Sequence, residues 1–152
     1  MADGPSNRFA ELDLSIDRDG LWRHQGEEIT HPGLLAALYN ALQRIDGDWF
    51  VCAENLKVPV KVADCPYVVL SVRHYEDRIE LLLTDGRHVA LDPATLTVDR
   101  ENVPRCAIAP TGRPVRFSRT AWLQLAEAIE ENADGSYTLV AGGRRHPLRF
   151  TA

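Results

Sequence analysis

The segment 30–52, THPGLLAALYNALQRIDGDWFVC, constrains the fold most, because its pattern occurs a second time 88 positions later. Thr30 is predicted to cap a helix, and Pro32 suits the helix start, where its missing N–H costs nothing. Asp46-Gly47 is predicted to end this helix, since glycine takes the left-handed conformation without a Cβ clash. The run WFVC then predicts a strand. Apolar spacing predicts one buried helical face, made of Leu34, Leu38, Ala41, Leu42 and Ile45.

The second copy begins at Ser118, which takes the capping position of the first. Asp134-Gly135 matches the earlier Asp-Gly pair without a gap, and Pro147 also falls on a proline. Each copy therefore predicts a helix, a glycine-terminated turn, a strand, a hairpin and a strand. Any two amphipathic helices followed by strands would align in part, but the coincident Asp-Gly and proline positions favour an internal duplication.

The sequence thus predicts an α+β fold with two repeated units, each one helix packed on a small antiparallel sheet. Asp85-Gly86 is a strong hairpin signal between two β-rich runs and predicts a β-meander. Residues 98–104 are the best linker candidate. The predicted order is a flexible N-terminus, a first repeat unit, a meander with its linker, and a second repeat unit packed with the meander: residues 1–13, 14–66, 67–104 and 105–152.

Composition limits the classes of function. The 152 residues are 45% hydrophobic, enough to bury a core without disulfides, and the net charge of −5 argues against general nucleic-acid binding. No apolar run is long enough to span a membrane, and the polar N-terminus lacks a secretory pattern. Three cysteines without a CxxC pair indicate neither a disulfide framework nor a zinc ribbon. We therefore expect a cytoplasmic protein with no cofactor and no membrane partner.

Arginines cluster in a stretch of the second half that contains no acidic residue. Between Glu101 and Glu127 lie only basic charged residues, namely Arg105, Arg113, Arg116 and Arg119. Arginines on strands usually face water, and such a cluster can also attract the acidic first half of the chain. Alternatively, the cluster binds an anion or a phosphate, which the planar guanidinium fits well.

The familiar enzyme signatures are absent from the sequence. It has no phosphate-binding glycine loop, no nucleophile elbow and no HExxH or CxxC metal spacing. Cys65, in a loop after Asp64, is the one cysteine expected to be exposed enough to react. An enzyme would then pair Cys65 with His74 or His88, although no spacing supports that pairing.

Four short motifs carry a family resemblance. They are DRDGLW, EITHP, DGDW and VKVADCPY, at residues 17–22, 28–32, 46–49 and 60–67, and the similarity runs over most of the chain, from about residue 16 to residue 150. The chain resembles the bacterial domain-of-unknown-function family 1285, whose members carry an RDG-x-W opening and a V-E-D-A-P-F segment. Ala63, Cys65 and Tyr67 stand where that segment has Glu, Ala and Phe. The resemblance implies that Cys65 is not a nucleophile.

The resemblance also implies a duplicated α+β fold with a pleckstrin-homology-like C-terminal half that forms a partial barrel. It implies a cleft between the halves for a nucleotide-based ligand, and a role in signal transduction. Three hypotheses follow, in this order: a non-enzymatic ligand-binding or sensory module for an anionic small molecule, a protein-interaction adaptor that binds a signalling partner without a small ligand, and a Cys/His enzyme.

The predicted ligand site has a wall, a stacking face and anion contacts. Asp64, Pro66 and Tyr67 form the wall, and Trp22 or Tyr67 supplies the stacking face, although a strand tryptophan is more often a core residue. Trp122, on the apolar helix face, is predicted to be core. The complete set is Trp22, Asp64, Pro66, Tyr67, Arg73, Arg87, Arg113 and Arg116.

Overall fold

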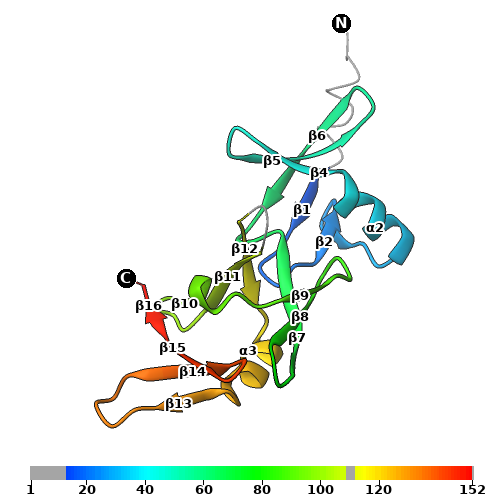
Figure 1. Ribbon diagram of the computed structural model, residues 1–152. Helices are drawn as coiled ribbons and strands as arrows, with labels where there is room; N and C mark the ends of the chain where they lie inside the picture. The colour runs from blue at the N-terminus through cyan, green and yellow to red at the C-terminus, as the bar shows by residue number, and fades with distance from the viewer. Residues whose placement is uncertain (1–12, 109–111, 152) are drawn as a thin grey trace, which may run out of the picture. The chain divides into compact units, whose positions relative to one another are not determined.

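A computed structural model describes residues 13–108 and 112–151 of the chain (Figure 1). The chain divides into two compact units, Met1–Pro66 and Tyr67–Ala152. Helices and strands in three sheets make an α+β fold, which confirms the predicted class. The segment predicted to be flexible, 1–13, lies outside the described residues except for its last one. Within the described ranges, no helix is long and apolar enough to cross a membrane.

Unit 1 combines helix α2 (Pro32–Ala41) with a six-stranded sheet in the order β3-β2-β1-β6-β5-β4. Strand β1 pairs in parallel with β6, so the sheet is mixed and not purely antiparallel as predicted. The helix contacts β5. The strands are β1 (Leu14–Ile16), β2 (Trp22–His24), β3 (Glu27–Glu28), β4 (Leu42–Ile45), β5 (Asp48–Ala53) and β6 (Leu56–Val62).

Helix α2 ends earlier than predicted. Leu42 already has extended backbone angles, and β4 pairs antiparallel with β5. Asp46 and Gly47, with φ of 52° and 88°, form the tight turn between these two strands. An Asp-Gly pair suits a two-residue hairpin as well as a helix end. The prediction that it stops the helix was wrong, because the chain had already become extended.

The start of α2 also differs from the prediction. His31, not Thr30, caps the helix, since its Nδ1 accepts a hydrogen bond from the Leu34 N–H at 3.1 Å. The predicted buried face is wrong at Leu34, whose side chain is 47% exposed. Tyr39 supplies the buried side instead, with its ring edge-on to Trp22 at 5.4 Å between centroids.

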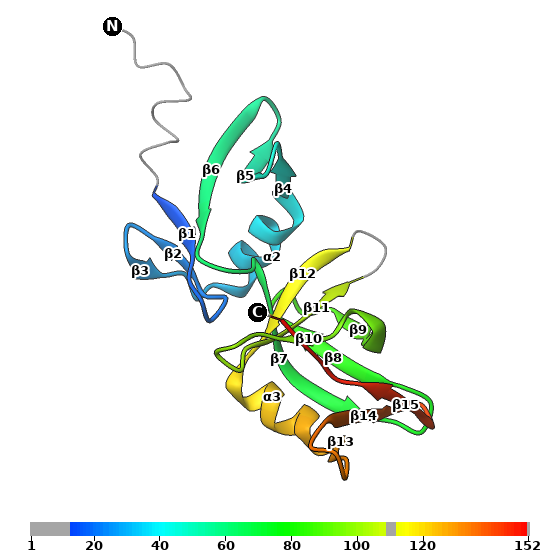
Figure 2. The ribbon, with the colours of Figure 1, turned by 90° about the vertical axis from the view of Figure 1, so that its left-hand side faces the viewer.

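Unit 2 contains a seven-stranded sheet in the order β16-β10-β11-β12-β7-β8-β9, a three-stranded sheet β13-β14-β15 and helix α3 (Arg119–Ala126). Helix α3 packs on β7 (Figure 2). Strands β7, β8 and β9 form the predicted antiparallel meander. The strands are β7 (Tyr67–His74), β8 (Ile79–Leu83), β9 (His88–Ala90), β10 (Thr97–Val98), β11 (Pro104–Ile108), β12 (Arg113–Phe117), β13 (Ile129–Glu131), β14 (Tyr137–Ala141), β15 (Arg144–Pro147) and β16 (Arg149–Phe150), and a single turn of 3-10 helix, η1, spans Pro93–Thr95.

The segment 98–104, expected to be a linker, runs from the end of β10 to the start of β11 through a hydrogen-bonded turn. The Asp99 carboxylate accepts from the backbone N–H groups of Glu101 and Val103 at 2.9 and 3.0 Å. Arg105 donates to the same carboxylate at 2.6 Å. The Arg105 hydrogen bond, with those backbone donors, lowers the pKa of Asp99 to about 2. This turn is therefore a fixed part of unit 2.

Helix α3 begins as predicted, because the Ser118 hydroxyl accepts from the Ala121 N–H at 3.1 Å. Its buried side includes Ala121 and Leu125, neither of which is exposed to solvent. After α3 come β13, a turn that contains Gly135, strand β14, the Gly142-Gly143 turn and strand β15. This order, one helix and three strands, is also that of α2, β4, β5 and β6 in unit 1.

Candidate functional site

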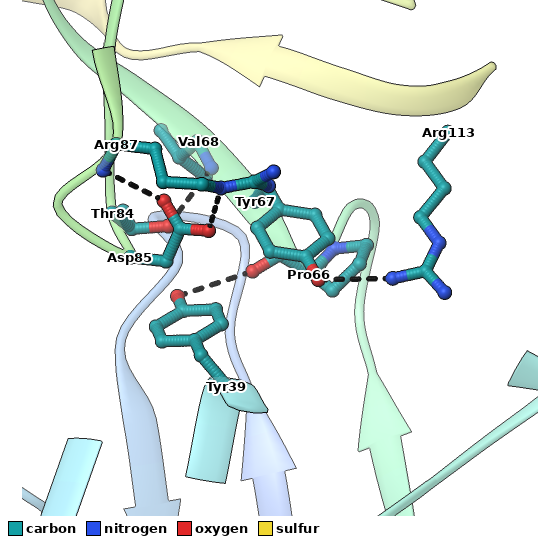
Figure 3. A network of polar contacts seen from close by, with 8 residues as sticks. All are labelled: Tyr39, Pro66, Tyr67, Val68, Thr84, Asp85, Arg87 and Arg113. Carbon is teal, nitrogen blue, oxygen red and sulfur yellow. Dashed lines mark hydrogen bonds and ion pairs between the residues drawn. The ribbon is translucent and has the colours of Figure 1, made fainter. Parts of the chain in front are cut away.

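Tyr67, Arg87 and Arg113 lie together in unit 2, and we call them the Tyr67-arginine cluster (Figure 3). Arg113 Nη1 donates a hydrogen bond to the Tyr67 hydroxyl at 3.1 Å. The guanidinium carbon of Arg87 lies 5.5 Å from the centroid of the Tyr67 ring, within cation–π range. The structure thus brings together three of the eight residues that the sequence singled out.

Strand pairing places Arg113 beside Tyr67. Tyr67 is the first residue of β7, and β12 runs parallel to β7 with Val115 opposite Tyr67. Side chains two residues apart on a strand share a face, so Arg113 lies on the same face of β12 as Val115. Arg116, an odd number of residues away, lies on the other face. The two arginines of this strand therefore cannot serve one site.

Arg87 is held by the turn that precedes it. The Asp85 carboxylate accepts from the Arg87 backbone N–H at 3.0 Å and forms an ion pair with the guanidinium. The Asp85 side chain is only 9% exposed, whereas that of Arg87 is 51% exposed. The adjacent Thr84 hydroxyl accepts from the Val68 N–H at 3.2 Å, which ties this turn to β7. The charged side chains drawn in Figure 3 are thus the guanidinium groups of Arg87 and Arg113 and the carboxylate of Asp85.

Pro66 precedes the cluster in the chain and is anchored within unit 1. Its carbonyl oxygen accepts a hydrogen bond from the Tyr39 hydroxyl at 3.2 Å (Figure 3). Both Pro66 and Tyr67 are buried. Tyr67, at 3% exposure, offers no open ring face, so the predicted stacking role does not fit this structure.

The other predicted site residues lie apart from the cluster. Trp22 is 1% exposed, and within the described ranges its Nε1–H meets no acceptor, so its ring is a core element of unit 1 and not a stacking face. Asp64 is half-buried and lines a groove of about 590 Å³ with Arg44 and Lys61. Arg73 is exposed, and a hydrogen bond with Tyr75 raises its pKa.

Arg116 lines a different groove of about 330 Å³, together with Trp122. Trp122 was predicted to be core, yet it is only half-buried. The helix face that carries it was inferred from apolar spacing, which identifies a stripe on a helix but not which part of it the sheet covers.

The arrangement does not support the Cys/His enzyme. Cys65 was expected to be exposed, but it is only 3% exposed, and its thiol donates to Asp64 at 3.5 Å. His74 Nε2 lies 2.8 Å from the Gln124 carbonyl oxygen, and His88 Nδ1 lies 3.3 Å from the Glu80 carboxylate. In the described part of the chain, no group of three His, Cys, Asp or Glu side chains could hold a metal ion.

Sequence reasoning missed Asp85 and Tyr39 as parts of this network. Asp85 was interpreted only as a turn residue. An acidic residue two positions before an arginine, however, indicates that the two side chains could form an ion pair across the turn. No local pattern indicates the bond from Tyr39 to Pro66, because 27 residues separate them.

No family model matches the sequence, and no curated protein matches it. Two solved structures are similar. A DUF1285 family protein from Silicibacter pomeroyi DSS-3 matches with a TM-score of 0.72 at 21% identity, over 91% of this chain and 80% of that one. A DUF1285 family protein from Shewanella baltica OS155 matches with a TM-score of 0.62 at 16% identity, over 78% of this chain and 93% of that one. At these identities the likeness establishes the fold.

Proposed function

Because the chain has the fold of DUF1285 proteins, we propose that it is a non-enzymatic ligand-binding or sensory module, which holds an anionic, nucleotide-like small molecule at the Tyr67-arginine cluster. The observation that carries this proposal is the convergence of Arg87 and Arg113 on one buried tyrosine. Arg113 is the first residue of β12, and Arg87 lies in the turn between β8 and β9. The pairing of strands in the seven-stranded sheet therefore brings the two arginines together.

Both arginines are oriented before any ligand arrives. A guanidinium has five N–H donors in a planar fork, so Arg87 can keep its bond to Asp85 while its terminal nitrogens contact a phosphate oxygen. The Tyr67 hydroxyl fixes one edge of Arg113. Orientation in advance reduces the loss of side-chain entropy on binding. The two guanidinium groups then favour an anionic ligand, whose oxygens they can bind in a planar geometry.

The ligand's anionic group, not a base, is the part that this cluster would recognise. The Tyr67 ring is covered on one side by Arg87 and is almost fully buried. Stacking needs an open aromatic face. A phosphorylated metabolite without an aromatic base therefore fits the cluster as well as a nucleotide does.

We also propose that the chain arose by internal duplication. Support comes from the shared element order of α2-β4-β5-β6 and α3-β13-β14-β15, and from Gly47 and Gly135, which both have a φ of 88°. A pleckstrin-homology-like description of the C-terminal half is a proposal of the same kind, consistent with the packing of α3 on the sheet that includes β7 and β12. A cytoplasmic location is a further proposal, which the three thiols support. A role in signal transduction is proposed with it.

A thermal-shift screen against nucleotides, cyclic nucleotides and other phosphorylated metabolites tests the proposal. A ligand at a hundredfold its Kd adds about 2.7 kcal/mol to the free energy of unfolding. For a chain of this size that corresponds to a rise in Tm of about 5–10 °C. Arg113→Gln and Arg87→Gln should each abolish the shift.

Arg119→Gln is the matched control. It removes the same charge from an exposed position of unit 2, on α3 and outside the cluster, and should leave the shift intact. Loss of the shift in all three variants would mean that ligand binding depends on the net charge of the protein and not on the Tyr67-arginine cluster. No shift with any compound would refute the ligand-binding proposal and favour the adaptor, for which exposed Leu123 and Leu70 would be the first contacts to mutate.

A further inference from the structure

A second hollow of unit 2 is lined by aromatic side chains, and we call it the aromatic groove. It has a volume of about 380 Å³, within the range of small-molecule sites. Trp122 on α3, Tyr137 on β14 and Phe150 on β16 contribute their rings to it. Three aromatic residues from three separate elements therefore line one concave surface.

The rings are available to a ligand. Tyr137 is 37% exposed and Phe150 is 56% exposed, although both are large and apolar. Their ring centroids lie 6.2 Å apart with the planes tilted by 59°. At such a tilt the two rings do not stack face to face on each other. The negative face of each ring can thus contribute to the potential inside the groove.

The one formally charged side chain among the described residues that line the groove is negative. Glu131 lines it, and Glu131 lies opposite Tyr137 in the β13–β14 pair. No Lys, Arg or His lines the groove among the described residues, although the chain has 17 Lys and Arg. In the same part of the chain Glu131 forms no ion pair, whereas its neighbour Glu130, on the other face of β13, pairs with Arg145 at 3.4 Å.

We propose that the aromatic groove binds a small quaternary ammonium cation of the choline type. Aromatic faces attract a cation through the ring quadrupole, and a ligand whose charge is spread over methyl groups loses little hydration on entering an apolar hollow. Glu131 supplies the opposite formal charge at the rim. An anion is disfavoured here by the carboxylate, so this site and the Tyr67-arginine cluster select ligands of opposite sign.

The first test follows the indole N–H signal of Trp122 by NMR while choline chloride or tetramethylammonium chloride is added. Trp122→Phe identifies this signal among those of the three tryptophans. Sodium chloride of equal ionic strength is the reference, and the neutral tert-butyl analogue of choline tests the role of charge. We expect a saturable shift with both cations and at least about fivefold weaker binding of the neutral analogue. Equal binding of the neutral analogue, or no saturable shift, would overturn the proposal.

Two variants locate the site. Phe150→Leu keeps an apolar side chain but removes the ring, and Glu131→Gln removes the charge at nearly constant size; each should weaken binding by about fivefold or more. Glu130→Gln is the matched control, since it removes the same charge from the other face of the strand. Unchanged affinity in Phe150→Leu, or an equal loss in Glu130→Gln, would overturn the assignment. None of these outcomes depends on whether the Tyr67-arginine cluster binds an anion.

Discussion

Adding one methyl group at Gly142 should destabilise unit 2 more than adding the same methyl at its neighbour, Gly143. Both glycines have positive φ, 59° and 73°, so alanine pays the left-handed penalty of about 1–2 kcal/mol at either position. The surroundings differ. A Cβ at Gly142 would lie 2.8 Å from the carbonyl oxygen of Asp77, whereas nothing lies within 4 Å of a Cβ at Gly143.

The contact at Gly142 cannot be relieved by a side-chain rotation, because the Asp77 oxygen belongs to the backbone. Either the β14–β15 turn or the turn after β7 must move, and overpacking of this kind costs about 1–3 kcal/mol. We therefore expect a loss of about 1–2 kcal/mol for Gly143→Ala and about 2–5 kcal/mol for Gly142→Ala. Native-state amide exchange of the β14 backbone measures both losses in unit 2, separately from unit 1.

A further control lies in unit 1. Gly47 has a φ of 88° and nothing within 4 Å of an added Cβ. Gly47→Ala should therefore lower the free energy of unfolding by as much as Gly143→Ala does. Equal losses at Gly142 and Gly143 would refute the reasoning, since they would mean that the Asp77 backbone gives way freely and does not hold the hairpin turn.

Three other predictions concern the Tyr39 hydrogen bond, the Asp99 carboxylate and the buried Cys65 thiol. Tyr39→Phe removes the hydrogen bond to the Pro66 carbonyl and should cost about 0.5–1.5 kcal/mol in urea unfolding; an unchanged midpoint would contradict it. The folded-state pKa of Asp99 is depressed, so its contribution to stability is present above the ordinary value of 3.8 and is lost as pH falls toward about 2. The free energy of unfolding of Asp99→Asn should therefore depend less on pH across this range than that of the original protein. Native Cys65, being buried, should react with iodoacetamide far more slowly than after denaturation, and equal rates would exclude its burial.

The parts of the fold that local chemistry encodes could be predicted from sequence. Asp85-Gly86 correctly placed the hairpin between β8 and β9, because few residues other than glycine tolerate its φ of 89°. Ser118 correctly marked the start of α3 for a similar reason, since an N-cap depends on bonds three residues away. The sequence also predicted a turn at Asp46-Gly47, but the predicted role as a helix end was wrong, because an Asp-Gly pair suits a hairpin turn as well as a helix end.

Long-range pairing could not be read from the sequence, and it decides the candidate site. Arg87 and Arg113 stood in the predicted set as cations, but only the parallel pairing of β12 with β7 brings Arg113 to Tyr67. The same pairing sends Arg116 to the opposite face. The exposure of Cys65 was wrong for a related reason: a loop residue before a proline can be covered by segments that are distant in sequence.

A comparison of the two helix-and-hairpin segments, α2-β4-β5-β6 and α3-β13-β14-β15, distinguishes what the local sequence determines from what long-range contacts determine. Position 54 of the first corresponds to position 142 of the second, and both have positive φ, 53° in Glu54 and 59° in Gly142. Turn geometry alone therefore does not require glycine there. Gly142 has a second constraint, because the Asp77 carbonyl occupies the space that a Cβ would fill. The residue type at this position follows from the tertiary neighbour, while the turn itself follows from the local chain, and a comparison of the two segments tells these causes apart.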